Sequence, residues 1–269
     1  MCVVFIPFIT FLLLLLTQNE YICIINIGIR EGDSMNMHEI VGLKVDMGYK
    51  HPRMLAQAEA YRCENSGKPD ITIYLSDSYI DSKVKDNPGL SHDHCEYIYT
   101  GSIFYDSLIH FDGFVLHASA VVVDGKAYLF SAPSGTGKST HTRLWLEHFK
   151  ERAVILNDDK PAIRVMDNSI KVYGTPWSGK TALNVNMEAE LQGICFLERD
   201  SYNHIEEITK GEAIIRVMNQ TLRPRTENNM DILLKTLDTV ISQTHIYKMG
   251  CTISEEAVLL AYERMRSDL

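Results

Sequence analysis

The sequence has no cluster of basic residues, and this absence argues against one broad class of function. Its 269 residues include 26 Lys and Arg against 35 Asp and Glu, which gives a formal net charge of −9. A protein whose main partner is nucleic acid carries a basic patch that neutralises phosphates. We therefore expect no nucleic-acid partner. The 45% of hydrophobic residues suffice for one sizeable core and a small second lobe.

Paired cysteines are also missing. The six cysteines lie far apart, with no C-x-x-C pair and no neighbouring histidines at the spacing of a zinc site. This spacing argues against structural zinc and fits a reducing compartment, so we expect a cytoplasmic protein.

The first residues are apolar, but the apolar run is shorter than a membrane span. Residues 3–16 are apolar, but Gln18-Asn19-Glu20 separates them from a second apolar patch at 21–29. A membrane span needs about 20 apolar residues, and a signal peptide needs a basic start and a small-residue cleavage site. We therefore expect residues 1–36 to be a hydrophobic leader that is either a misassigned start or a membrane segment.

A misassigned start is the preferred interpretation. Arg30-Glu31-Gly32 can be encoded by AGG-GAG-GG, a ribosome-binding sequence ahead of Met35 or Met37, and sequence typical of a folded domain begins only at His38. If the leader is translated, Arg30 on its C-terminal side places the rest of the chain in the cytosol. A start at Met1, Met35 or Met37 stays open.

A loop typical of phosphate binding occupies residues 132–140, Ala-Pro-Ser-Gly-Thr-Gly-Lys-Ser-Thr. It follows an apolar run and precedes residues with helical spacing. The sequence departs from G-x-x-x-x-G-K-[ST] in having Ala132 at the first glycine. Glycines let the backbone approach a polyphosphate, while N–H groups and the lysine face its oxygens. We predict that ATP is bound by Ser134, Gly135, Thr136, Gly137, Lys138, Ser139 and Thr140, with Ser139 placed to hold Mg²⁺.

Two adjacent acids, Asp158 and Asp159, follow the apolar run 153–157 downstream of this loop. Phosphoryl transfer needs a metal clamp and a group that positions or deprotonates the acceptor. One carboxylate can serve the metal and the other the acceptor hydroxyl. Adjacent acids in a turn are often only solvated, but their position after a buried-type strand favours the catalytic interpretation.

The remaining pattern predicts a small N-terminal lobe and a larger α/β domain. A polar stretch at 83–94 is the expected boundary, with domains at 37–95 and 96–269. Asp124-Gly125 predicts a hairpin. The other expected strands cover residues 39–47, 70–75, 114–123, 126–131, 153–157, 161–166, 170–173, 193–197 and 205–208. The expected helices cover residues 96–110, 210–222, 229–242 and 254–266.

Taken together, three segments resemble the catalytic domain of HPr kinase/phosphorylase and, more distantly, the nucleotide half of ATP-dependent phosphoenolpyruvate carboxykinase. They are Leu116-His117-Ala118-Ser119-Ala120, the loop 134–139, and Leu156-Asn157-Asp158-Asp159. The resemblance spans residues 114–269. It implies an α/β fold with a mixed sheet of the P-loop kinase type, joined to a small α+β N-terminal lobe.

The same resemblance implies roles for individual residues. His117 would lie beside the reacting phosphate, Lys138 would assist transfer, Asp158 would act as the base toward an acceptor serine, and Asp159 would share Mg²⁺ with Ser139. Without the resemblance, His117 is better explained as a satisfied core histidine.

A second loop, Gly174-Thr-Pro-Trp-Ser-Gly-Lys180, offers Ser178, Gly179 and Lys180 as candidates for contacting phosphate or the acceptor. The structural alternative is a loop whose Trp177 packs inward. Arg199 is a candidate for relieving charge on the moving phosphoryl group.

Departures from the family narrow the prediction. Where the family has Glu-x-Arg-Gly, linked to the reverse reaction, this sequence has Gln192; we therefore expect little phosphorylase activity. The N-terminal lobe does not match that of the bifunctional enzymes, which argues against HPr itself as the substrate. We predict an ATP-dependent kinase for a serine of a small protein or peptide, or free serine. A non-catalytic ATP-binding regulatory protein and a bifunctional kinase/phosphorylase are the alternatives, and a homo-oligomer stays open.

Overall fold

The computed structural model describes residues 36–64, 67–167, 169–224 and 226–266. The predicted leader lies outside the described residues, apart from Asn36 at its end. Within the described residues, no helix is both long and apolar enough to cross a membrane.

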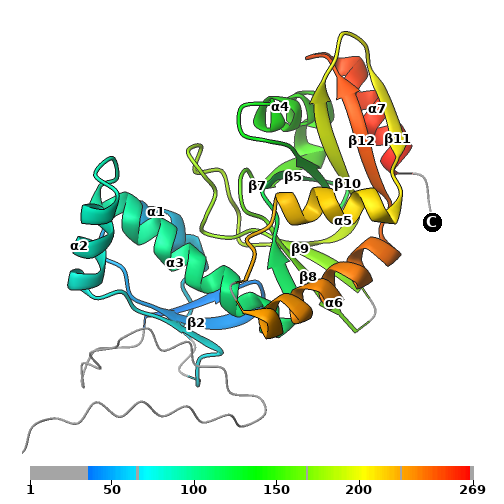
Figure 1. Ribbon diagram of the computed structural model, residues 1–269. Coiled ribbons are helices and arrows are strands. Elements are labelled where there is room, and N and C mark those ends of the chain that lie inside the picture. Colours follow the sequence, from blue (N-terminus) through cyan, green and yellow to red (C-terminus); the bar gives the residue numbers. More distant parts are fainter. Residues whose placement is uncertain (1–35, 65–66, 168, 225, 267–269) are drawn as a thin grey trace, which may run out of the picture.

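The helices and strands fall into two parts, seen on the left and right of Figure 1. The N-terminal part contains β1 (Met37–Ile40), β2 (Leu43–Met47), α1 (Pro52–Ala58), β3 (Ile71–Ile73), α2 (Asp77–Asp86) and α3 (His92–Leu108). The larger part contains β4 (Gly113–Val115), β5 (Ala118–Val123), β6 (Lys126–Ser131), α4 (Lys138–Phe149), β7 (Ala153–Asn157), β8 (Ala162–Met166), β9 (Ser169–Tyr173), β10 (Glu188–Arg199), β11 (His204–Glu207), α5 (Lys210–Asn219), α6 (Glu227–Gln243), β12 (Ile246–Cys251) and α7 (Glu255–Met265).

The N-terminal part corrects two expectations. The strand predicted over 39–47 is the β1–β2 hairpin, because Val41 and Gly42 both have positive φ (59° and 69°), as a two-residue hairpin turn requires. The polar stretch 83–94 is not a long loop, since its first residues end α2 and its last residues begin α3. The Ser91 hydroxyl accepts from the His94 N–H and caps α3.

The larger sheet is mixed and forks at β10. On one side β10 runs parallel to β6, which pairs antiparallel with β5, and β5 pairs antiparallel with β7. On its other side β10 pairs first with β9 and then with β12. The fold is therefore mixed α/β, as expected. Strand β12 was missed in the sequence, although it extends the sheet that carries the loop.

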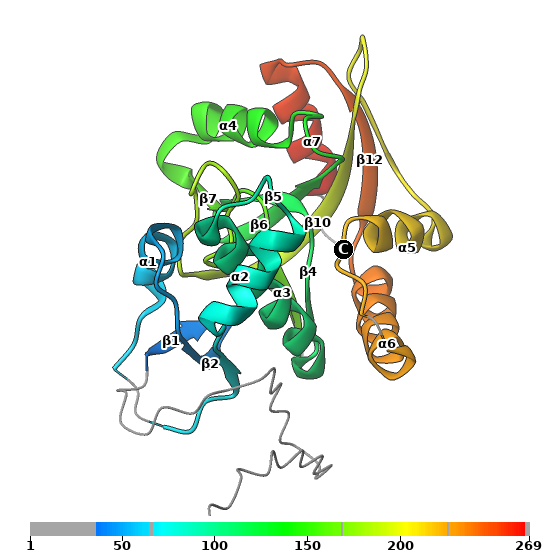
Figure 2. The same cartoon turned by 60° about the vertical axis from the view of Figure 1, so that its left-hand side comes forward.

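Alternating side chains of the central strands pack against helices on opposite faces of this sheet. In β6, Ala127 and Leu129 face the cluster that includes α5 and α6, whereas Tyr128 and Phe130 face the cluster of α4 and α7. Figure 2 shows α5 and α6 on one side of β10 and α4 on the other. Because side chains alternate along a strand, the sheet is covered on both faces, and the domain has three layers: α5 and α6, the sheet, and α4 with α7. The loop after β6 leads from the sheet layer into α4.

The apolar run 114–123 is two strands rather than one. β4 pairs with β8, and β5 pairs with β6 and β7, so the chain changes partners at Leu116 and His117. His117 therefore lies in a break between strands. The domain boundary expected between residues 95 and 96 falls inside α3, whose Tyr97, Phe104 and Leu108 belong to the apolar cluster of the N-terminal sheet.

Candidate active site

The 132–137 loop connects β6 to α4, as the sequence predicts. Gly135 and Gly137 have φ values of 80° and 126°, which side chains disfavour. A Cβ at either glycine would meet no atom within 4 Å, so the glycines serve the backbone conformation and leave open space beside the loop. Ser134 and Thr140 are exposed, and Thr136 and Ser139 are half-buried. A loop with this backbone and this free space fits a bound phosphate chain.

Lys138 is the first residue of α4 and is buried, with 8% of its surface exposed. Its Nζ donates to the carbonyl oxygen of Ala132 at 2.9 Å. Burial lowers the pKa of Lys138, and the nearby carboxylates of Asp159 and Asp158 oppose this shift without cancelling it. The ammonium group therefore lacks full compensation, as expected of a group that awaits an anion.

A cavity of about 350 Å³ lies beside the loop. Its lining includes Gly135, Thr136, Leu144, Leu197, Arg199 and Ile253. Arg199, at the end of β10, donates from Nε to the Thr136 carbonyl (3.1 Å) and from Nη2 to the Gly135 carbonyl (2.5 Å). The guanidinium group therefore holds the loop from its carbonyl side, next to a cavity that is partly apolar.

The two acids lie on a tight turn that Asn157 organises. The Oδ1 of Asn157 accepts from the backbone N–H groups of Asp159 (2.9 Å) and Lys160 (2.7 Å), and its Nδ2 donates to the Thr175 carbonyl. Asn157 is fully buried at the end of β7. One amide side chain thus fixes the turn and ties it to the 174–187 loop.

Asp158 points into a network of hydroxyl groups. Its Oδ1 accepts from Ser119 Oγ at 2.6 Å, and its Oδ2 accepts from Thr181 Oγ1 at 2.9 Å. The residue is buried, with 6% of its surface exposed. A carboxylate surrounded by hydroxyl donors can orient an alcohol and receive its proton.

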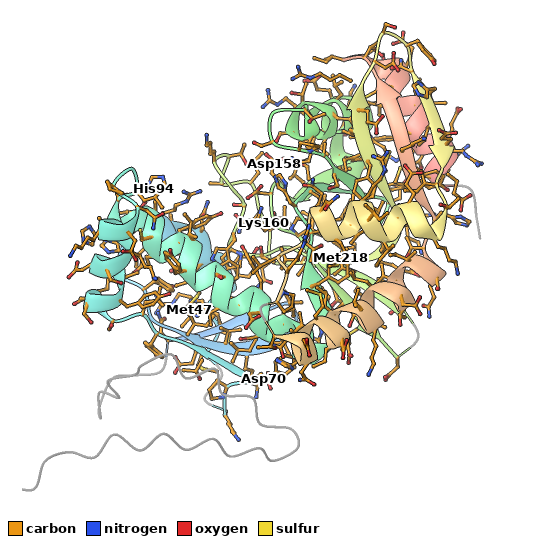
Figure 3. The ribbon with its side chains drawn as sticks, in the orientation of Figure 1. Met47, Asp70, His94, Asp158, Lys160 and Met218 are labelled. Atoms are coloured by element: carbon orange, nitrogen blue, oxygen red, sulfur yellow. The ribbon has the colours of Figure 1, made fainter. Side chains whose placement is uncertain are left out.

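Asp159 lies between the side chains of His117 and Lys160. Its Oδ1 is 3.3 Å from His117 Nε2, and its Oδ2 is 3.1 Å from Lys160 Nζ. Burial acts to raise the pKa of Asp159, but the hydrogen bond from His117 and the charge of Lys160 outweigh it and hold the pKa below its usual value. Figure 3 labels Asp158 and Lys160 at the junction of the two parts of the molecule.

His117 is fixed from several directions. Its ring Nδ1 lies 2.8 Å from Oε1 of Gln220. Its backbone N–H donates to the Gln220 carbonyl at 2.8 Å, and its backbone carbonyl accepts from Ser131 Oγ at 2.8 Å. These bonds aim Nε2 at Asp159. The His117 side chain is therefore half-buried and fixed beside Asp159, with both ring nitrogens partnered.

The loop between β9 and β10, residues 174–187, is anchored by the side chains of Trp177 and Ser178. Trp177 is fully buried and stacks on Phe104 of α3 with ring centroids 4.9 Å apart. Ser178 is also fully buried: Gln57 Nε2 donates to its hydroxyl, which donates to Asn184. The packing alternative thus describes Trp177, whereas the hydroxyl of Ser178, a candidate for ligand contact, is engaged in internal hydrogen bonds. Lys180 is exposed.

Gly179 lies directly against the acids and is held by the N-terminal part. Its φ is 74°, and a Cβ there would come within 2.8 Å of Asp159 Cβ. Its N–H donates to Tyr97 Oη at 2.9 Å, and its carbonyl accepts from Arg53 Nη2. The Arg53 guanidinium lies 3.6 Å from the centre of the Tyr97 ring. Helices α1 and α3 therefore set the position of this loop.

The donor set suits a loosely held hard cation rather than a closed metal cage. Among the described residues, no three His, Cys, Asp or Glu side chains gather into a metal site. Mg²⁺ in phosphate-binding sites takes only one or two protein ligands, because phosphates and water supply the rest. Ser139 and Asp159 are residue types that such a site uses, and both oxygens of Asp159 also have protein partners, His117 and Lys160.

Gln192 does not lie at this site. It occupies the bulge of β10 between Leu191 and Gly193, which pair with Ala127 and Tyr128 at the start of β6, whereas the loop follows the end of β6. Its Nε2 donates to the Met265 carbonyl of α7. The position of Gln192 therefore gives no structural support for linking this residue to the reverse reaction, and the expectation of little phosphorylase activity stays a prediction.

Several residues of the site were missed in the sequence. Lys160 follows the two acids directly, and its position was a usable signal. Ser119 lies in the same segment as His117, Thr142 follows the 132–140 loop by two residues, and Thr181 directly follows the loop 174–180, so their positions were usable signals as well. Arg53 and Gln220 had no local signal, because they reach the site from distant segments.

No protein-family model matches the sequence, and no curated protein matches it. Among solved structures, the Hpr(Ser) kinase/phosphatase from Coxiella burnetii is similar, with a TM-score of 0.31 and 12% identity, over 55% of this chain and 91% of that chain. A likeness this distant carries no weight for the chemistry, so the function has to be inferred from the side chains.

Proposed function

We propose that the protein is an ATP-dependent serine kinase, which transfers the γ-phosphoryl group to a serine of a small protein or peptide, or to free serine. The observation that carries this proposal is the position of Asp158. The carboxylate accepts hydrogen bonds from hydroxyl groups, and it is linked through Ser119 to Thr142 of α4, one turn from Lys138. A candidate base for an alcohol therefore lies next to the candidate phosphate loop.

The other side chains supply the remaining requirements of phosphoryl transfer. The 132–137 loop and Lys138 bind the phosphate chain, and the incompletely compensated ammonium of Lys138 gains its partner on binding. Mg²⁺, held by Ser139 and Asp159, would neutralise phosphate charge. His117 and Lys160 lie against the two oxygens of Asp159, and the hydrogen bond from His117 and the charge of Lys160 hold the pKa of this carboxyl group below its usual value.

The nucleoside of ATP is proposed to occupy the cavity beside the loop. The cavity adjoins Gly135 and Thr136, so a phosphate chain on the loop leads directly to it. Leu144, Leu197 and Ile253 supply apolar surface for a base, and Arg199 keeps the intervening loop in place.

A non-catalytic ATP-binding regulatory protein is the second candidate. The observation in its favour is that both oxygens of Asp158 already accept from internal hydroxyls, those of Ser119 and Thr181. An external acceptor has to displace Thr181 to reach the carboxylate.

Substitution of Asp158 by asparagine separates the two candidates. The enzyme would be incubated with Mg²⁺, γ-labelled ATP and either free serine or a serine-containing peptide library, with nucleotide affinity measured by calorimetry. We expect Asp158→Asn to bind ATP as the wild type does and to lose about 100-fold or more in transfer rate. Asp238→Asn, on the exposed face of α6, is the matched control.

Tight ATP binding by the wild type with no transfer to any hydroxyl would favour the regulatory protein. Full transfer by Asp158→Asn would remove Asp158 from the role of base.

A further inference from the structure

Thr181 presents a hydroxyl group to the candidate base. Its Oγ1 lies 2.9 Å from Oδ2 of Asp158 and 3.3 Å from the carbonyl oxygen of Ser178. A hydroxyl has one proton to donate, and a bond to an ionised carboxylate is shorter and stronger than one to a neutral carbonyl. The Thr181 proton therefore points at Asp158, the arrangement that a kinase requires of its acceptor alcohol.

The same hydroxyl is joined to the first turn of α4 by a short chain of hydrogen bonds. From Asp158 the chain passes to Ser119 Oγ at 2.6 Å and on to Thr142 Oγ1 at 2.8 Å. Thr142 Oγ1 lies 3.3 Å from the Lys138 carbonyl. Because Ser119 gives its proton to Asp158, Thr142 donates to Ser119, and the chain ends on α4 at Thr142, one turn after Lys138.

The chain around Thr181 is held at both ends and exposed in between. On one side Ser178 is buried and Gly179 is bound by Arg53 and Tyr97. On the other side Asn184 Nδ2 donates to Tyr61 Oη at 3.1 Å. The intervening residues 180–183 are exposed.

The backbone in this short span is also constrained. Ala182 has a φ of 53°, which is unfavourable for a residue with a Cβ. A short anchored turn offers its hydroxyl in one orientation, and positioning of this kind removes much of the entropic cost of bringing two reactants together.

We infer that Thr181 is a self-phosphorylation site of this protein, an inference that rests on the proposed kinase function. The Thr181 oxygen forms a bond to the γ-phosphorus of ATP while the bond between that phosphorus and the β,γ-bridging oxygen breaks. The bridging oxygen leaves with the electron pair as part of ADP, and the hydroxyl proton passes to the Asp158 carboxylate. The products are ADP and phosphothreonine at position 181.

The test uses the full chain with Mg²⁺ and ATP and no other acceptor. Mass spectrometry of the intact and the digested protein would count and locate added phosphoryl groups over time. We expect one phosphoryl group at position 181 in the wild type, phosphoserine at 181 in Thr181→Ser, and none there in Thr181→Ala. The control is Thr239→Ala, which removes a hydroxyl that donates to the Lys235 carbonyl within α6, and this variant should behave as the wild type does. Asp158→Asn should slow the reaction about 100-fold or more.

Calorimetric measurement of ATP binding in parallel distinguishes a failure of the self-phosphorylation from a failure of the proposed kinase function. ATP binding by the wild type without phosphate at position 181 would overturn the self-phosphorylation and leave the kinase proposal standing. Absence of ATP binding would overturn the kinase proposal and this inference with it. The rate per molecule should not depend on protein concentration, because the turn delivers Thr181 within its own chain. A rate that rises with concentration, or phosphate at another residue only, would refute the assignment.

Discussion

Replacement of Lys138 by methionine should stabilise the free protein while abolishing its response to ATP. The ammonium group is buried and makes a hydrogen bond to the Ala132 carbonyl, and burial lowers its pKa despite the nearby acids. In the absence of phosphate the net environment therefore opposes the charge. Methionine keeps the apolar stem and removes the charge.

The expected gain in stability follows from the cost of an incompletely compensated buried charge. Replacement of such groups by apolar side chains is neutral to stabilising by about 1–4 kcal/mol. Because Lys138→Met also loses the hydrogen bond to the Ala132 carbonyl, we expect the free energy of unfolding to rise by only about 1 kcal/mol. For a protein of this size, that corresponds to a melting temperature raised by about 2–4 °C.

The pKa of Lys138 is lower in the folded than in the unfolded state, so the charged ammonium group destabilises the folded protein. This destabilisation is fully present at pH values below the folded-state pKa, and it disappears as pH rises through the unfolded-state pKa of 10.5. The difference between the variant and the wild type should therefore shrink at alkaline pH.

In the presence of ATP the wild type should be more stable than Lys138→Met, the reverse of the order without nucleotide. At a nucleotide concentration of about 100 times Kd, binding stabilises the wild type by about 2.7 kcal/mol, or roughly 5–10 °C, whereas Lys138→Met gains nothing. Melting curves with and without Mg²⁺ and ATP measure both effects, and Lys235→Met on the exposed face of α6 is the control. A variant that melts below the wild type without nucleotide would refute the account of the ammonium, and a retained ATP shift would refute the phosphate loop.

Two further predictions concern the surroundings of the loop. The lowered pKa of Asp159 means that its stabilising contribution is present above its unfolded value of 3.8 and is lost as pH falls through its folded value; urea midpoints at pH 6 and pH 3 should therefore differ less in Asp159→Asn than in the wild type, and an unchanged difference would contradict the pairing with His117 and Lys160. Arg53→Lys should slow phosphoryl transfer about tenfold with unchanged ATP affinity, because a lysine cannot both stack on Tyr97 and hold Gly179. Exposed Arg62→Lys is the control, and a parallel loss of affinity would show that Arg53 acts through the loop after β6.

Short stretches of the sequence determined the elements that form the candidate phosphate site. The glycines of the 132–137 loop, the helix that follows it, the hairpin at Asp124-Gly125 and the acid pair after β7 depend on local backbone preferences and on side chains a few residues apart. Such preferences are visible without knowledge of the rest of the chain. The single strand expected over 114–123 failed for the complementary reason, since the break at His117 arises from a change of strand partners.

Only the tertiary structure decided how the site is completed. Gln220 fixes His117 across 103 positions, Arg53 holds Gly179 across 126, and Thr181 reaches Asp158 across 23. Ser178 and Thr181 lie three residues apart in the same polar loop, yet one is buried against α1 and the other donates to the candidate base. The direction of a loop side chain depends on the surfaces that the fold brings against it, and those surfaces come from segments whose distance along the chain hides their contact.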